Sequence, residues 1–130
     1  MSGWFVRVLT IGSVVLATLI LVVSAARAQG PLLEAYMAFL GPADHFNSRG
    51  ARLTEPWQVI RQDRANFHRY GVRDPGDEYD GFFASKSNRG RMEQMILHGY
   101  IDGNAGWRIV NENVWIRVEI YQNSVSVSVQ

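Results

Sequence analysis

Apolar and polar side chains alternate strictly near the C-terminus of this 130-residue chain. Val and Ile take every second position over residues 114–120, and Val alternates with Ser over residues 125–129. A period of two is typical of β-strands that bury one face. A two-residue turn at residues 122–123, or one at 123–124, keeps the Val and Ile side chains on the same face. The pattern therefore predicts an antiparallel β-hairpin.

The outer edge of this hairpin suggests a way to bind a partner. With the turn at residues 122–123, Ile120 stands opposite Val125. The backbone of Ser124–Val129 would then present unpaired N–H and C=O groups. We therefore expect this edge to form a homodimer or to accept a strand from another protein.

Apolar residues recur at helical spacing in four earlier segments: 31–40, 54–70, 87–98 and 102–110. The segment 31–40 is followed by Gly and Pro, which commonly end helices. The segment 54–70 has a Thr-Glu-Pro start and a glycine stop, and its apolar arc includes Tyr70. The helix over 87–98 would be capped by Ser87 or Asn88. Two glycines weaken the pattern over 102–110.

Together these segments predict an α+β fold in which three to four short helices pack on one face of a C-terminal antiparallel β-hairpin. An isolated hairpin is only marginally stable in water, so helices have to cover its apolar face. A chain of this length can bury enough surface for a single core. We therefore expect a single small α+β domain over residues 29–130.

Residues 1–28 have the features of a secretory signal peptide. Arg7 precedes an uncharged apolar run over residues 8–23, and Ala26-Arg27-Ala28 provides the small residues of a cleavage site. Cleavage would release the domain into the periplasm or the extracellular space. In the alternative, the leader stays attached and anchors the protein in the inner membrane, which is the only membrane contact expected.

Composition narrows the function further. The chain contains no cysteine, so disulfides are excluded and the core alone must hold the fold. Loss of Arg7 and Arg27 with the leader reduces the 13 basic side chains by two, and the chain has 12 acidic ones. The resulting net charge of about −1 argues against a nucleic-acid partner. No cofactor motif is present, and no residues have the spacing of a metal site.

Asp63 interrupts the apolar arc of the 54–70 helix. A buried carboxylate requires a cation or several N–H donors, so we expect Arg49 or Arg52 to pair with Asp63 in a structural polar hub. A competing hypothesis is a small hydrolase or metal-dependent enzyme centred on Asp63, His68 and His45. Because these residues match no catalytic signature, a protein without enzymatic activity is favoured.

Residues 85–91 suggest another kind of site, because three cations surround the start of a predicted helix. Backbone N–H groups, polar side chains and cations together can bind an anion, and the residues concerned are Ser87, Asn88, Arg89 and Arg91. The simpler interpretation is that the acidic run over 74–80 folds back and pairs with Lys86, Arg89 and Arg91.

Small size, predicted export and the lack of a catalytic motif favour one function class. We expect an exported binding or interaction protein that is not an enzyme, and the sequence does not identify its target. The enzyme centred on Asp63 and the anion-binding module at residues 85–91 are the two alternatives.

Overall fold

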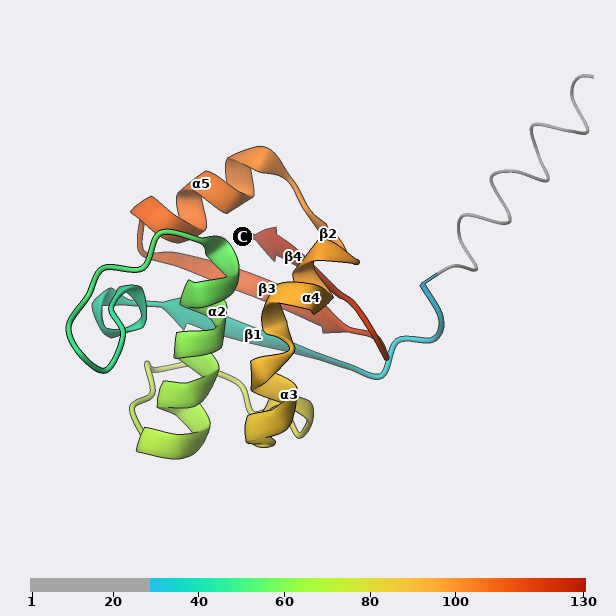
Figure 1. Ribbon diagram of the computed structural model, residues 1–130, viewed down its shortest axis with the longest axis horizontal. Coiled ribbons are helices and arrows are strands. Elements are labelled where there is room, and N and C mark those ends of the chain that lie inside the picture. The colour runs from blue at the N-terminus through green and yellow to red at the C-terminus, as the bar shows by residue number, and fades with distance from the viewer. Residues whose placement is uncertain (1–28) are drawn as a thin grey trace, which may run out of the picture.

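A mixed sheet forms the centre of the fold (Figure 1). The computed structural model describes residues 29–130, in which four strands are arranged in the order β1-β3-β4-β2. Their bounds are Glu34–Leu40 for β1, Tyr100–Ile101 for β2, Val114–Ile120 for β3 and Val125–Val129 for β4. Strand β3 is antiparallel to both β1 and β4, whereas β2 is parallel to β4. The α+β class is confirmed, with a larger sheet than the expected hairpin.

The hairpin of β3 and β4 has the expected register. Ile120 pairs with Val125, and the N–H of Tyr121 donates to the carbonyl of Ser124 at 2.9 Å across the turn at residues 122–123. The alternating Val and Ile side chains of β3 are at most 5% exposed. The alternation of apolar and polar residues therefore predicted both strands of the hairpin and the face that is buried.

The helix expected over residues 31–40 is wrong, because this segment forms strand β1. Every residue of β1 pairs with β3, from Glu34 opposite Ile120 to Leu40 opposite Val114. Tyr36, Ala38 and Leu40 alternate along the strand and are fully buried. The apolar residues of this segment fit either period, and pairing with β3 decides between them.

Helix α2 (Pro56–Ala65) begins close to the expected start. Gln58 Oε1 accepts the backbone N–H groups of Thr54 and Glu55 at 3.0 and 3.1 Å, so it caps the helix start. The helix continues as a wider π-helical turn, Asn66–Tyr70, and Gly71 ends it with a φ of 66°. The wider turn rotates Tyr70 outward, which is why this residue is 49% exposed rather than buried.

The helix expected over residues 87–98 is divided in two. Helix α3 (Lys86–Gly90) and helix α4 (Met92–Leu97) meet at Arg91. Ser85 caps α3 instead of Ser87 or Asn88, and its Oγ accepts the Asn88 N–H at 3.3 Å. Helix α5 (Gly103–Asn111) confirms the segment 102–110, and the Asp102 carboxylate accepts the Ala105 N–H at 2.7 Å.

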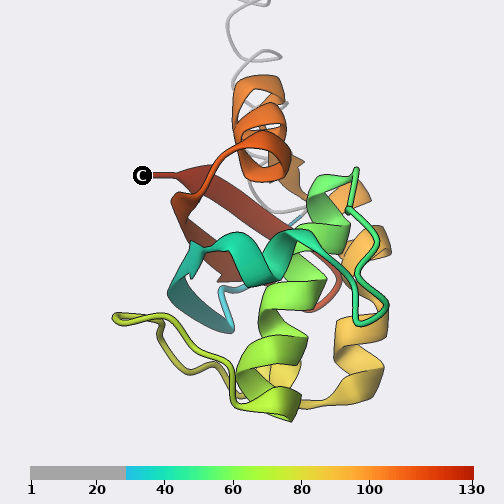
Figure 2. The same cartoon turned by 90° about the vertical axis from the view of Figure 1, so that its left-hand side faces the viewer.

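Helices α2, α3 and α4 cover one face of the sheet (Figures 1 and 2). The core between them is continuous and includes Tyr36, Ile60, Phe83, Met92 and Ile116, all fully buried. Within residues 29–130, no helix combines the length and apolarity needed to cross a bilayer. The predicted leader, residues 1–28, lies outside the described residues.

Both edges of the sheet are partly covered. Along β1, the segment 72–81, here called the acidic loop, supplies carboxylates to the strand. Glu78 Oε1 accepts the Met37 N–H at 2.7 Å, and Asp77 Oδ1 accepts the Phe39 N–H at 2.8 Å.

At the other edge, β2 pairs with Ser126 and Val127 of β4. β2 therefore covers the middle of the segment Ser124–Val129, and the expected strand addition would have to use the residues beyond Val127.

Candidate functional site

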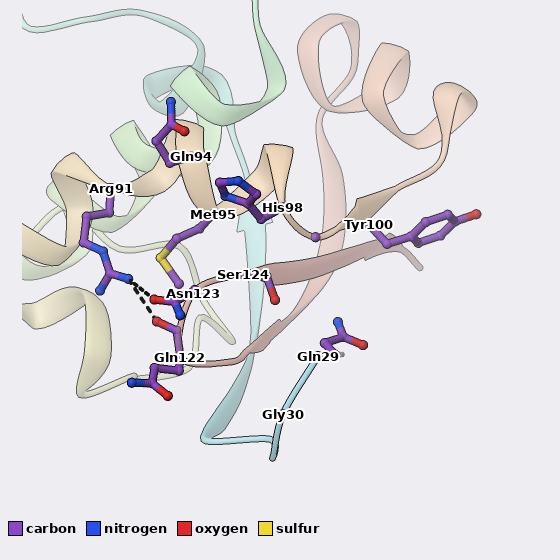
Figure 3. Close-up of a pocket in the computed structure, with 11 residues that line it drawn as sticks. Gln29, Gly30, Arg91, Gln94, Met95, His98, Tyr100, Gln122, Asn123 and Ser124 are labelled. Carbon is purple, nitrogen blue, oxygen red and sulfur yellow. Dashed lines mark hydrogen bonds between the residues drawn. The ribbon is translucent and has the colours of Figure 1, made fainter. Parts of the chain in front are cut away.

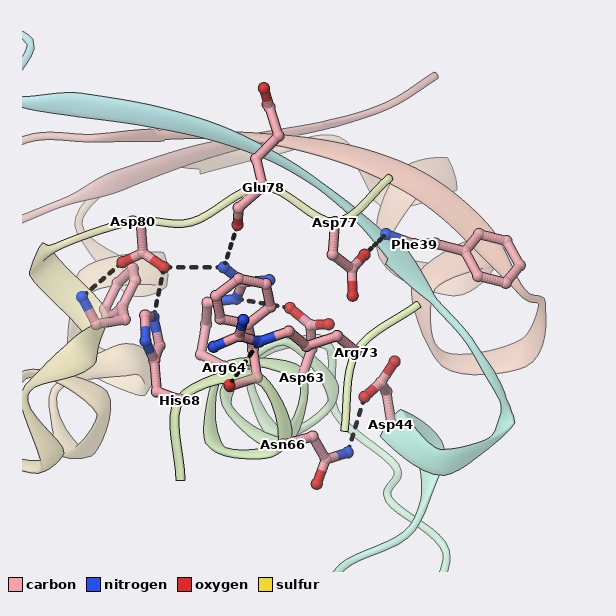
Figure 4. A network of polar contacts seen from close by, with 12 residues as sticks. Phe39, Asp44, Asp63, Arg64, Asn66, His68, Arg73, Asp77, Glu78 and Asp80 are labelled. Atoms are coloured by element: carbon pink, nitrogen blue, oxygen red, sulfur yellow. Dashed lines mark hydrogen bonds and ion pairs between the residues drawn. The ribbon is translucent and has the colours of Figure 1, made fainter. Parts of the chain in front are cut away.

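Four charged or titratable side chains form a cluster between α2 and the acidic loop, here called the Arg64 cluster: Asp63, Arg64, His68 and Asp80 (Figure 4). The Arg64 guanidinium is fully buried and donates to Asp63 Oδ2 and Asp80 Oδ1, both at 2.8 Å. It also donates to the carbonyl of Glu78 at 3.0 Å. His68 Nε2 lies 2.8 Å from Asp80 Oδ1. Two carboxyl groups thus accept hydrogen bonds from one buried arginine.

Burial controls the proton affinities in this cluster. It raises the pKa of Asp63 to about 8, against the opposing effect of the Arg64 guanidinium. Although burial by itself lowers the pKa of Arg64, its neighbours Tyr36 and Asp63 raise it above the usual value. Burial also raises the pKa of Tyr36 well above its ordinary value. Arg64 therefore stays charged, whereas Asp63 takes up a proton near neutral pH.

The partner expected for Asp63 is wrong. Arg64, the next residue along the chain, binds its carboxylate, and neither Arg49 nor Arg52 does so. Arg52 Nη2 donates to the carbonyl of Val110 at 2.6 Å, and the Arg49 N–H takes part in a local turn. A buried polar hub exists at Asp63, but α2 and the acidic loop form it, and the loop before α2 does not.

The residues of the enzyme hypothesis have separate partners. His45 is 2% exposed, and its ring nitrogens lie 2.8 Å from the carbonyl of Gly41 and 2.9 Å from that of Ile109. His68 and Asp63 belong to the Arg64 cluster, and no hydrogen bond within residues 29–130 joins them to His45. Among the same residues, no three His, Cys, Asp or Glu side chains gather in a way that could hold a metal ion.

The expected anion site at residues 85–91 is dispersed. Arg89 is 8% exposed, and its Nη1 donates to the carbonyls of Phe83 and Ala84 at 2.8 and 3.0 Å. Asn88 Nδ2 donates to the carbonyl of Phe82 at 2.9 Å. These two side chains fasten the turn before α3, while Ser87 is exposed and Arg91 lies on another surface.

The pairing expected between the acids of 74–80 and Lys86, Arg89 and Arg91 is also wrong. Asp77 and Glu78 bind the backbone of β1, and Asp80 belongs to the Arg64 cluster. Backbone N–H groups along an edge strand need acceptors, and carboxylates meet this need. The acidic residues of this run therefore bind the edge of the sheet and the Arg64 cluster, and they do not pair with the basic segment.

An open groove of about 1000 Å³ lies beside the end of α4, β2 and the β3–β4 turn (Figure 3). The N-terminal end of the described chain also borders it. The side chains that line it are mostly polar and come from Gln29, Arg91, Gln94, Met95, His98, Tyr100, Gln122, Asn123 and Ser124, with Gly30 and Gly99 between them. Of these residues, the sequence indicated Arg91 as part of an anion site and Ser124 as the first residue of the partner-binding edge.

A close backbone approach shapes the floor of this groove. Gly99 lies against the carbonyl of Val125, where a Cβ atom would collide with the oxygen. This contact lets β2 lie beside β4 directly after α4 ends. Three segments distant in sequence therefore meet at one concave surface.

No known protein resembles the chain in any of three comparisons, since no family, no curated protein and no solved structure matches it. Its function has to be argued from its own geometry.

Proposed function

We propose that this protein is an exported binding protein without enzymatic activity, and that its ligand occupies the groove beside Arg91 and Tyr100. The observation that supports this is the contrast between two sets of polar side chains. Those of the Arg64 cluster are buried and bind one another, whereas most of those of the groove are open to solvent, with Ser124 as the buried exception. Concave surfaces with a few convergent polar groups are the usual place for small ligands.

Several side chains of the groove have hydrogen-bond donors and acceptors that no other described residue binds. Within residues 29–130, the side-chain amides of Gln94 and Gln122 and the ring of His98 make no hydrogen bond to another residue. An amide provides both a donor and an acceptor, and a neutral imidazole does so too. A ligand that offers both kinds of group would therefore find partners along the whole groove.

The buried cluster is a poorer candidate for chemistry. Asp63, Arg64 and Asp80 are each at most 2% exposed, so a substrate could not reach them without local opening. Their hydrogen bonds join α2 to the acidic loop, which is a structural role. This arrangement favours binding over catalysis as the function of the protein.

Ligand titration followed by NMR tests the proposed site. Amide shifts of the ¹⁵N-labelled protein would be recorded with a panel of small sugars, carboxylic acids and amines. We expect shifts confined to residues 91–100 and 122–124 for at least one class. Shifts centred on His68 and Asp80, or turnover of a chromogenic ester, would overturn the proposal.

Export has its own test. Cell fractionation followed by mass spectrometry of the N-terminus is expected to find the protein outside the cytoplasm, with Gln29 as its first residue. A cytoplasmic protein that retains Met1 would contradict the predicted export, whatever the groove binds.

A further inference from the structure

The charge of the groove points to the class of its ligand. Of the side chains that line it, Arg91 alone has a permanent charge, and none belongs to Asp or Glu. A cationic ligand would lose its hydration there without gaining a carboxylate partner. The groove therefore favours a ligand that is neutral over most of its length and has a negative group near Arg91.

The guanidinium of Arg91 is already oriented. Its Nη2 donates to the carbonyl of Gln122 at 2.9 Å and to Asn123 Oδ1 at 3.1 Å, both in the β3–β4 turn (Figure 3). Within residues 29–130, no acidic side chain forms an ion pair with it. The N–H groups on Nε and Nη1 remain, and each can donate a charge-assisted hydrogen bond to a carboxylate.

The rest of the groove fits hydroxyl groups and a ring. Hydroxyls donate and accept at once, and so do the amides of Gln29, Gln94 and Gln122. At the opposite end from Arg91, Tyr100 is 65% exposed and presents an aromatic ring (Figure 3). The apolar C–H face of a sugar ring can cover such a surface while its hydroxyls stay at the rim.

We propose that the groove binds an acidic oligosaccharide, with a uronate carboxylate on Arg91 and a sugar ring against Tyr100. This inference rests on the proposed function, because it names the ligand of the same groove. Because Arg91 and Tyr100 lie at opposite ends of the groove (Figure 3), a ligand that contacts both has to be extended. An exported protein would meet such polymers at the cell surface.

Calorimetric titration with three probes tests the ligand class. The probes are tetragalacturonate, its full methyl ester, and inorganic phosphate, so that sugar and charge vary independently. We expect the acid to bind at least about tenfold more tightly than the ester, with an affinity that falls as salt rises. Phosphate alone is expected to bind at least about tenfold more weakly than the acid, since it cannot reach Tyr100.

Matched variants locate the contacts. Arg91→Gln is expected to remove the preference for the acid over the ester, and Tyr100→Ala to weaken both by about three- to tenfold. The controls are Arg69→Gln and Trp107→Ala, an exposed arginine and an exposed tryptophan that do not line the groove. They are expected to change neither affinity.

Each unfavourable result has a distinct meaning. Equal affinity for acid and ester, or binding that Arg91→Gln leaves unchanged, overturns the acidic ligand but not the groove. Phosphate binding as tight as that of the acid replaces the oligosaccharide with a simple anion. If none of the probes binds while the NMR panel still shifts the groove, the ligand class is wrong and the proposed function stands. If no compound of the NMR panel shifts the amide signals of the groove residues, the proposed function fails as well.

Discussion

The guanidinium of Arg64 lies over the ring of Tyr36, 4.1 Å from its centroid, and both side chains are fully buried. The same guanidinium lies 4.5 Å from the centroid of the Phe67 ring, so both aromatic rings and carboxylates stabilise its positive charge. Such stacking suits arginine, because its charge is delocalised and weakly hydrated. The contact links β1 to α2 in the interior of the fold.

We expect Tyr36→Phe to leave the stability unchanged or to raise it by up to about 1 kcal/mol. The Tyr36 hydroxyl is buried and has no hydrogen-bond partner among the described residues, so its removal relieves a desolvated polar group while the ring stays over Arg64. Urea unfolding followed by fluorescence measures the difference. A loss above about 1 kcal/mol would show that the hydroxyl has a partner after all.

Removal of the buried Arg64 cation should destabilise the folded protein strongly. Arg64→Met leaves Asp63 and Asp80 without their shared donor, so we expect a loss of about 3–5 kcal/mol in the free energy of unfolding. Arg61→Met on the same helix is the control, because Arg61 is exposed and its loss should cost less than about 0.5 kcal/mol. If the two variants prove equally stable in urea, the cluster is not structural.

The raised pKa of Asp63 predicts a pH dependence of stability. Its value of about 8 in the folded protein lies above the unfolded value of about 4, so the folded state binds the proton more tightly. The contribution of Asp63 is therefore complete below about pH 4 and disappears as the pH rises through 8, with a slope of at most about 1.4 kcal/mol per pH unit.

Asp63→Asn isolates this effect, since it keeps the size of the side chain and cannot titrate. Unfolding in urea at pH 5, 6, 7 and 8 should give a smaller decline for the variant than for the wild type. Identical slopes would assign the pH dependence to other groups.

Gly99→Ala should destabilise the fold by about 2 kcal/mol or more, because the new methyl group would collide with the carbonyl of Val125 and separate β2 from β4. Gly90→Ala is the matched control: it also lies at a helix end, but its added methyl group meets no atom within 4 Å. Thermal melts of both variants compare them directly. A neutral Gly99→Ala would mean that β2 can shift away at no cost.

The acidic loop makes a prediction at single-residue resolution. In Asp77→Ala the Phe39 N–H should exchange with solvent faster, and in Glu78→Ala the Met37 N–H should do so, since each loses its carboxylate acceptor. Hydrogen exchange followed by NMR would detect the change, with Glu93→Ala on α4 as the control. Unchanged protection of both amides would remove the role assigned to the loop.

The sequence predicted the elements whose signals are local. Alternation of Val with Ser indicated β4 and its register with β3, the Thr-Glu-Pro start indicated α2, and helical spacing indicated α5. Strand β1 was missed because its buried set includes Ala38, a residue typical of helices, and because Leu33 and Leu40 lie at helical distances from Tyr36. Only the partner strand resolves that ambiguity, and it lies far along the chain.

The polar sites depend on tertiary contacts more than the helices and strands do. Asp63 was expected to be buried because it interrupts an apolar arc, yet its partner Arg64 follows it directly and reaches across to Asp80. The groove could not be foreseen, since amides have no characteristic spacing and its residues come from three separate segments. Arg91 was identified for its charge and assigned to the wrong surface.

The coverage of both sheet edges has a consequence for how the protein behaves when it is concentrated. A long edge strand with unpaired backbone groups promotes fibril formation. Without Asp77 and Glu78, β1 would be such a strand. Carboxylates on that border also repel the same border of another molecule. Replacing both with Asn and Gln would remove this repulsion and weaken the cover of the strand, so aggregation of that double variant is expected to begin at β1.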